Sequence, residues 1–160
     1  MATENKNLSE YDKSALPDAS QMRIGLVVSE WNSEITENLF RGARETLLAC
    51  GVSPEHITRW NVPGSFELPF GCRRLINHFP QNAVVAIGSV IRGETSHFDF
   101  VCEAVSQGIK DRNLKGDTPV IFCVLTDDTL EQARDRSGGK HGNKGTEAAI
   151  AAIKMAALGH

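Results

Sequence analysis

One short segment of the sequence combines a glycine, two hydroxyl side chains and a histidine. It spans 92–97, reads Arg-Gly-Glu-Thr-Ser-His and follows the apolar run 83–91. Its last residue, His97, should lie in the first turn of a helix, whose positive end favours a neutral imidazole. A neutral imidazole can take and return protons. The segment therefore predicts an acid–base residue at His97, the alternative being an ordinary surface histidine.

The same segment also has the features of an anion site. Gly93 allows a backbone turn that other residues resist, so the amides of Gly93, Glu94 and Thr95 can point into one concavity. Successive amide N–H groups ahead of a helix attract phosphate. The alternative is that Ser96 and Asp99 form a capping box and that the segment merely begins the helix.

Three further groups of residues have types that suit ligand contact. Trp31 follows an apolar strand and either stacks on a flat heterocycle or packs in the core. Glu67 lies in the first turn of a predicted helix, where it either complements the dipole or accepts hydrogen bonds from hydroxyls. Arg136, Lys140 and Lys144 recur four apart through a glycine-rich bend, which is either an anion site or a solvated basic loop.

Alternating strand and helix patterns must position these residues. Apolar runs predict strands over 23–28, 56–62, 83–91 and 120–125, of which 83–91 is central and 56–62 lies nearer an edge. Helices are expected from the cap Asn32 or Ser33 to the stop at Gly51, and over 65–77, 96–113, 130–136 and 144–158. The pattern implies an α/β fold, a flavodoxin-like three-layer α/β/α sandwich whose four-stranded parallel sheet has helices on both faces.

This topology also predicts where a ligand binds. In open parallel sheets the ligand lies beyond the carboxyl ends of the strands. The unusual residues follow strands in this way, at 31–32, 64–67, 92–97 and 126–128. We therefore expect one site at that edge of the sheet.

Length and composition narrow the class of protein. The 160 residues suit a flexible polar arm over 1–20 and a single domain over 21–160. A net charge of −3 argues against a nucleic-acid binder, and no apolar run approaches the roughly 20 residues of a membrane helix. The four cysteines are far apart and offer no zinc site or short disulfide framework, which fits a cytoplasmic location.

Together these segments resemble the lumazine synthase family. The matching strings recur in order between about Ile24 and Leu158, at 31–32, 62–69, 88–99, 119–122 and 142–149. The resemblance implies a transferase that needs no metal or cofactor. Its reaction would condense 5-amino-6-ribitylamino-2,4(1H,3H)-pyrimidinedione with 3,4-dihydroxy-2-butanone 4-phosphate. The products would be 6,7-dimethyl-8-ribityllumazine, phosphate and water, in the penultimate step of riboflavin biosynthesis.

The resemblance implies two sets of substrate contacts. In the first, Trp31 would stack on the pyrimidine, while the ribityl chain would be held by Asn32, Ser65 and Glu67. The substrate-binding residues that complete this part of the site are Gly64, Phe66, Val90 and Ile91.

The second set concerns the phosphate and the proton transfers. By the resemblance, the amides of Gly93, Glu94 and Thr95 would bind phosphate together with Arg136, and His97 would donate and accept protons. Phe122 would close the pocket from a neighbouring subunit, and Lys144 would add a polar contact.

A pocket closed by a neighbour implies a homo-oligomer. The family forms rings of five, and a decamer or a 60-subunit shell stays open, as does riboflavin synthase as a partner. Two other readings also stay open. One is the archaeal-type riboflavin synthase of related fold, and the other is a non-catalytic or weakly catalytic shell protein that binds flavin or lumazine.

Overall fold

Four parallel strands form the centre of the protein. The structure is a computed structural model that describes residues 7–159. The strands are β1 (Ile24–Ser29), β2 (Ile57–Val62), β3 (Ala83–Ile91) and β4 (Val120–Asp127), in the order β2-β1-β3-β4. Each neighbouring pair is parallel. The predicted parallel sheet is confirmed, with β3 in its interior and β2 at one edge.

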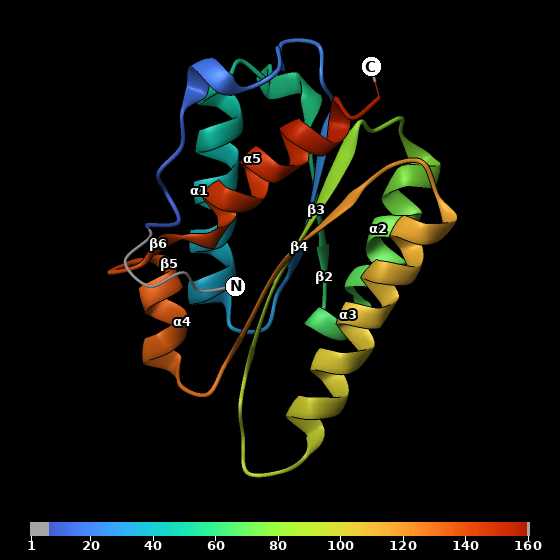
Figure 1. Ribbon diagram of the computed structural model, residues 1–160. Helices are drawn as coiled ribbons and strands as arrows, with labels where there is room; N and C mark the ends of the chain where they lie inside the picture. The colour runs from blue at the N-terminus through green and yellow to red at the C-terminus, as the bar shows by residue number, and fades with distance from the viewer. Residues whose placement is uncertain (1–6, 160) are drawn as a thin grey trace.

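Helices cover both faces of this sheet, which confirms the three-layer α/β/α fold (Figure 1). On one face lie α1 (Ser33–Ala49), α4 (Leu130–Arg136) and α5 (Lys144–Ala156), and on the other α2 (Leu68–His78) and α3 (His97–Lys115). The short 3-10 helices are η1 (Lys13–Ala15), η2 (Pro54–His56) and η3 (Ser65–Glu67). A small hairpin, β5 (Ser137–Gly139) and β6 (Gly142–Asn143), joins α4 to α5. No helix within residues 7–159 has the length and apolar character that crossing a bilayer requires.

The core consists of two apolar layers, one on each face of the sheet. Successive strand residues point to opposite faces, so Leu26 and Val28 pack toward α1 and α5 while Val27 packs toward α2. The first layer is compact because α5 approaches α1 closely: a Cβ on Gly145 would collide with the Leu39 carbonyl oxygen. The helices α1 and α5 are therefore packed tightly against each other on this face.

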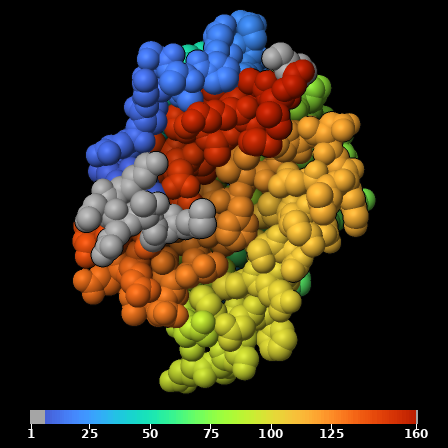
Figure 2. Space-filling view, viewed as in Figure 1, coloured from blue at the N-terminus to red at the C-terminus, as the bar shows by residue number. Residues whose placement is uncertain are grey.

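The described part of the predicted arm, residues 7–20, lies against the domain. The Leu8 amide donates to the His141 carbonyl at 2.9 Å, and the Ser9 hydroxyl accepts from the Asn143 amide at 2.9 Å. Ala19 is fully buried among residues of α1 and α5. Figure 2 shows this N-terminal segment running beside α5. Residues 1–6 of the predicted arm lie outside the described residues, and the division at residue 20 stays a prediction.

Two predicted side-chain caps are wrong. Asn32 occupies the N-cap of α1 with a left-handed backbone (φ 55°), but its side-chain amide donates to the Ser89 carbonyl at 2.9 Å. Ser96 precedes α3 without capping it, and the carboxylate of Asp99 pairs with Arg92 instead. In both cases a partner from another element, or from before the helix, competes successfully with the helix end.

Candidate active site

The loops that follow the four strands meet at one edge of the sheet, at the lower end of Figure 1. Parallel strands place their carboxyl ends together, so the loops after β1, β2, β3 and β4 lie at the same edge. The predicted residues at 31–32, 64–67 and 92–97 lie between the end of a strand and the first residue of the following α-helix. Of the predicted segment 126–128, Thr126 and Asp127 are the last residues of β4 and do not follow the strand. The expectation that the unusual residues gather at this edge is confirmed.

Trp31 lies on the surface directly after β1. Its side chain is 73% exposed, so the core-packing alternative is wrong. The backbone holds it beside the end of β2, because its amide donates to the Pro63 carbonyl at 3.2 Å. A cleft of about 620 Å³ opens here, lined by Glu30, Trp31, Asn32, Ser33, Glu34, Ile35, Pro63 and Leu130. An exposed indole at the rim of such a cleft can stack on a flat ring.

Glu67 and Trp31 flank the backbone of Gly64. A Cβ on Gly64 would lie 3.0 Å from Glu67 Oε2 and 3.5 Å from Trp31 Cδ1. Glu67 and Phe66 are exposed, so the carboxylate is available to ligand hydroxyls. The structure therefore brings the predicted stacking residue and the predicted hydroxyl acceptor together.

Ser65 is buried at the start of η3. Gly64 occupies the N-cap of η3, and the Ser65 hydroxyl lies 3.5 Å from the Ser29 hydroxyl. Gly88 permits this position, because a Cβ there would lie 2.6 Å from Ser65 Oγ. The Ser65 hydroxyl therefore faces β1, and its role toward a ligand stays a prediction.

The segment 92–97 is exposed along its whole length and ends at His97, the first residue of α3. The His97 amide donates to Thr95 Oγ1 at 3.4 Å. The expected special turn at Gly93 is wrong, since only Gly51, Gly138, Gly142 and Gly159 have positive φ among the described glycines. A Cβ on Gly93 would meet nothing within 4 Å. Gly93 therefore leaves open space beside the backbone, which a ligand could approach.

Arg92 fixes this segment to the neighbouring strand end. Its backbone amide donates to the Asp127 carbonyl at 2.9 Å. Its guanidinium contacts Asp128 at 2.8 Å and Asp99 at 3.2 Å, and lies 4.2 Å from the centre of the Phe98 ring. The Asp128 carboxylate, then that of Asp99, raises the pKa of Arg92. Arg92 is thus occupied within the fold and positions the loop that follows it.

A second cleft, of about 650 Å³, is lined by Phe122 and by the three bases Arg136, Lys140 and Lys144. Its lining is Leu8, Phe122, Val124, Leu125, Thr126, Asp127, Gln132, Asp135, Arg136, Lys140, His141 and Lys144. The three bases that recur four apart therefore share one cavity, which favours the anion site over a solvated loop. Lys144 pairs with Glu147, and Lys140 lies 3.9 Å from Asp135.

Asp127 also lines this cleft and belongs to the unusual segment 126–128, but no role was predicted for it. It is the last residue of β4, is only 8% exposed, and lies 4.0 Å from Arg136 Nε. Burial raises the pKa of its carboxyl, an effect that Arg136 opposes and Asp128 reinforces. The available signal was its position, a carboxylate at the end of an apolar strand.

Five of the predicted site residues line two separate clefts within the described chain, and the others, among them Glu67 and His97, line neither of these clefts. Trp31 and Asn32 line the first cleft, Phe122, Arg136 and Lys144 line the second, and the two linings share no residue. Val90 and Ile91 are half-buried at the end of β3. One chain therefore does not assemble the whole predicted site in one cleft.

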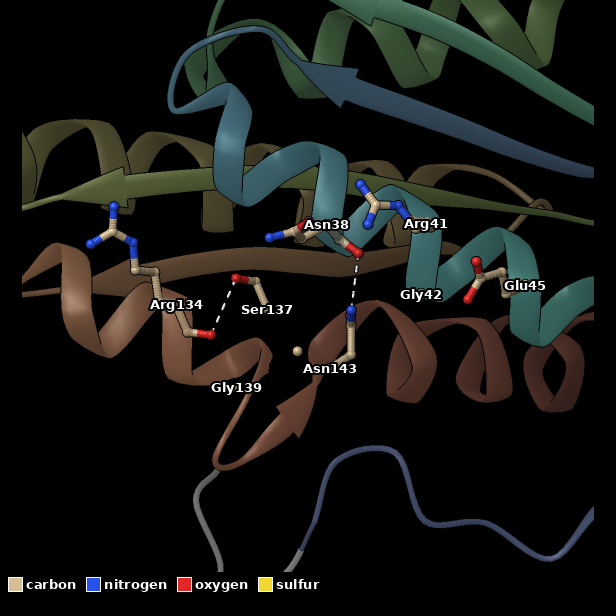
Figure 3. A pocket seen from close by; sticks show the side chains of 9 residues that line it. Asn38, Arg41, Gly42, Glu45, Arg134, Ser137, Gly139 and Asn143 are labelled. Carbon is tan, nitrogen blue, oxygen red and sulfur yellow. Dashed lines mark hydrogen bonds between the residues drawn. The ribbon is translucent and has the colours of Figure 1, made fainter.

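A smaller hollow of about 360 Å³ lies between α1, α4 and β5 (Figure 3). Its lining includes Arg41 of α1 and Arg134 of α4. Arg134 is bound by Glu34, with Nε 2.7 Å from the carboxylate. Asn143 crosses the hollow to donate to the Asn38 carbonyl at 2.9 Å. None of the predicted site residues lines this hollow. Its hydrogen bond from Asn143 to Asn38 connects the start of α5 to α1.

Comparison with known proteins identifies the family. The family model described as 6,7-dimethyl-8-ribityllumazine synthase matches residues 21–160. A relative of that name from Christiangramia forsetii is 64% identical over 99% of this chain and 95% of its own length. Relatives of the same name from Flavobacterium johnsoniae and Porphyromonas gingivalis are 64% and 52% identical, over 98% and 99% of this chain and 82% and 98% of their own lengths. The chain belongs to the 6,7-dimethyl-8-ribityllumazine synthase family.

Proposed function

We propose that the chain makes 6,7-dimethyl-8-ribityllumazine at sites that two neighbouring copies share. The reaction, which belongs to riboflavin biosynthesis, condenses 5-amino-6-ribitylamino-2,4(1H,3H)-pyrimidinedione with 3,4-dihydroxy-2-butanone 4-phosphate. Phosphate and water are the other products. The observation that carries the proposal of shared sites is the division of the site residues between two separate clefts.

The first group of residues suits the pyrimidine substrate. Trp31 presents an exposed ring for stacking, and the Glu67 carboxylate beside it can accept hydrogen bonds from the ribityl hydroxyls. The exposed amides of Gly93, Glu94 and Thr95 precede the N-terminus of α3, where an anion is favoured. His97 begins that helix and would shuttle protons.

The reaction requires proton transfers and the release of an anion. An amine attacks a ketone, water leaves to give an imine, and phosphate departs. The second amine then attacks the remaining carbonyl, and a second water leaves as the ring closes. Each step moves a proton or releases a neutral molecule or an anion, so an imidazole, amide donors and a guanidinium can assist it. Holding the two substrates together contributes most, about 7–11 kcal/mol in favourable systems.

The second group would come from the adjacent copy. Phe122, Arg136 and Lys144 line one cleft, so a neighbour that supplies Phe122 to close the site supplies Arg136 with it. The chain also exposes aromatic side chains beside the first group. Phe66, Phe70 and Phe100 are 59%, 65% and 70% exposed, and burying such rings is a common source of association energy.

The proposed assembly is the ring of five, located in the cytoplasm. Such a ring repeats one head-to-tail contact, so every copy gives one half-site and receives the other. Sedimentation of the purified protein separates a pentamer from a decamer and from a 60-subunit shell. Binding to riboflavin synthase belongs to the same proposal and is read by co-sedimentation of the two proteins.

Steady-state kinetics with both substrates test the proposed roles. Stacking on an aromatic side chain contributes about 1–3 kcal/mol, so Trp31→Ala should raise KM for the pyrimidine about tenfold or more. Arg136→Ala should instead raise KM for the butanone phosphate. A well-folded wild-type oligomer that does not accelerate the spontaneous reaction would overturn the function, and would favour a shell protein that only binds lumazine or flavin.

A further inference from the structure

We propose that Asp127 is a positioning residue, whose buried carboxylate holds the guanidinium of Arg136 in the orientation that receives the substrate phosphate. The inference rests on the proposed role of Arg136 and adds a residue that acts through it. Asp127 and Arg136 line the same cleft, at the end of β4 and the end of α4.

The contact between them leaves part of the guanidinium available. Asp127 Oδ1 approaches Arg136 at Nε, at 4.0 Å, and this is the one ion pair of Arg136 in the described part of the chain. A carboxylate on the Nε side leaves terminal N–H groups for a second anion, which the planar fork of arginine binds in a bidentate manner. The pair is therefore arranged to bind a phosphate without being broken.

Burial and backbone contacts make Asp127 the fixed member of the pair. The side chain of Asp127 is 8% exposed, against 32% for Arg136. Asp127 is paired with Ile91 across the β3–β4 ladder, and its carbonyl accepts the Arg92 amide at 2.9 Å. Arg136, by contrast, ends the short helix α4. A rigid strand end thus restrains a long side chain at a helix end.

The fold alone does not account for a carboxylate at this position. Oδ2 of Asp127 is buried without a hydrogen-bond partner within the described residues, although buried polar atoms are nearly always paired. Burial also raises the pKa of Asp127, so folding disfavours its charge. A group that the fold tolerates but does not satisfy is typical of a functional site.

Two substitutions of Asp127 test its effect on KM for the butanone phosphate. The pair is an ion pair at 4.0 Å with a partly exposed arginine, and loss of such a pair costs up to about fivefold, so Asp127→Ala should raise KM for this substrate about fivefold. Both kcat and KM for the pyrimidine should change less than about twofold. Asp127→Asn keeps an oxygen that can accept from Nε, so it should fold readily and raise KM less. Asp117→Asn, which removes an exposed carboxylate before the other end of β4, is the matched control.

A double-mutant cycle separates this inference from the role on which it rests. If Asp127 acts through Arg136, Asp127→Asn should change KM in the wild type and leave it unchanged beside Arg136→Ala. Arg136→Ala without effect on KM for the butanone phosphate would contradict the proposed role of Arg136. If that variant raises KM while Asp127→Asn has the same effect in both backgrounds, only the inference about Asp127 is overturned. An unchanged or lower KM in Asp127→Asn would overturn it as well.

Discussion

On one face of the sheet α1 and α5 pack against each other, whereas on the other face α2 and α3 cover the strands but present aromatic rings outward. Small residues make the first face compact, among them Gly42, Gly145 and the buried Ala148, Ala149 and Ala152. The second face has a comparable inner layer, with Leu68, Leu75 and Val105 fully buried. Its outer surface carries Phe70 and Phe100, both more than half exposed.

The difference in exposed aromatic rings between the two faces indicates which surface contacts a neighbouring copy in the proposed oligomer. The face of α1 and α5 buries one continuous apolar layer within the chain, and the N-terminal segment runs beside α5 (Figure 2). The exposed Phe66 directly precedes Glu67 in the half-site of Trp31 and Glu67, and among the described residues no arginine lines the cleft of that half-site. Association through this face would bury the rings and complete the site together.

The largest effect is expected from a charged substitution on the face of α2 and α3. Phe70→Asp places a charge on a side chain that is 65% exposed, so the chain should fold normally. Burying a phenylalanine contributes about 1.5–3 kcal/mol at each contact, so the ring should dissociate and activity should fall about a hundredfold. Sedimentation and steady-state rates measure both effects. Met155→Asp makes the same kind of change on α5 and should leave the oligomer intact; equal dissociation by both variants would contradict the comparison.

The second largest effect is expected on the face of α1 and α5, where a substitution should lower the free energy of unfolding and leave assembly unchanged. Gly145→Ala adds one methyl group where α5 meets the Leu39 carbonyl. Overpacking of this kind costs about 1–3 kcal/mol, which chemical denaturation of an assembly-deficient Phe70→Asp background measures. Gly93→Ala is the control, because a Cβ there meets nothing within 4 Å. A stability unchanged by Gly145→Ala would show that this face is less compact than the structure has it.

Cysteine reactivity distinguishes the inner layers from the outer surface. Burial raises the pKa of Cys72 and of Cys123 to about 12, one on each face, and Cys102 on α3 is half-buried with a smaller rise. Thiolates are the reactive species, so alkylation should spare Cys72 and Cys123 in every assembly state. Cys102 should react faster in Phe70→Asp than in the wild type. Equal protection of Cys102 in both proteins would place α3 away from the interface.

The smallest effect concerns the pH dependence of stability at Asp127. Its folded pKa lies above the ordinary value of 3.8 through burial, so the folded protein binds more protons than the unfolded chain just above pH 3.8. The free energy of unfolding therefore falls as pH rises through this window. The other charged or titratable residues that line the cleft are Asp135, Arg136, Lys140, His141 and Lys144. Asp128 acts on Asp127 from beside the cleft, and Glu147 pairs with Lys144.

Asp127→Asn removes this titration. The variant should match the wild type most closely below pH 3.8 and gain stability relative to it at neutral pH, as read by thermal unfolding over a pH series. A variant that is less stable than the wild type at neutral pH would show that the charge of Asp127 supports the fold.

The sequence predicted the architecture because its apolar patterns are strong. The run 83–91 became β3 in full and 130–136 became α4, both with the predicted bounds. Strand β4 extends to Asp127, beyond the expected end at Leu125, because its ladder with β3 continues through polar residues. The pattern of apolar residues carries no signal for such an extension.

The grouping of the site residues could not be predicted in the same way. Types and spacing identified Trp31, Glu67 and Arg136 individually, but which of them share a cleft depends on the sheet order β2-β1-β3-β4. The capping function of Asn32 failed for a related reason, because its partner, the Ser89 carbonyl, lies 57 residues away in sequence.

The most direct test of shared sites is complementation between two defective variants. His97→Ala and Arg136→Ala each impair a different half-site, so each alone should have low activity. When the two chains are refolded together, a shared site predicts that about a quarter of the contacts join an intact His97 to an intact Arg136. Activity should then rise well above the mean of the two separate variants. Activity equal to that mean, in an oligomer shown to contain both chains, would mean that each chain carries its own complete site and would contradict the account.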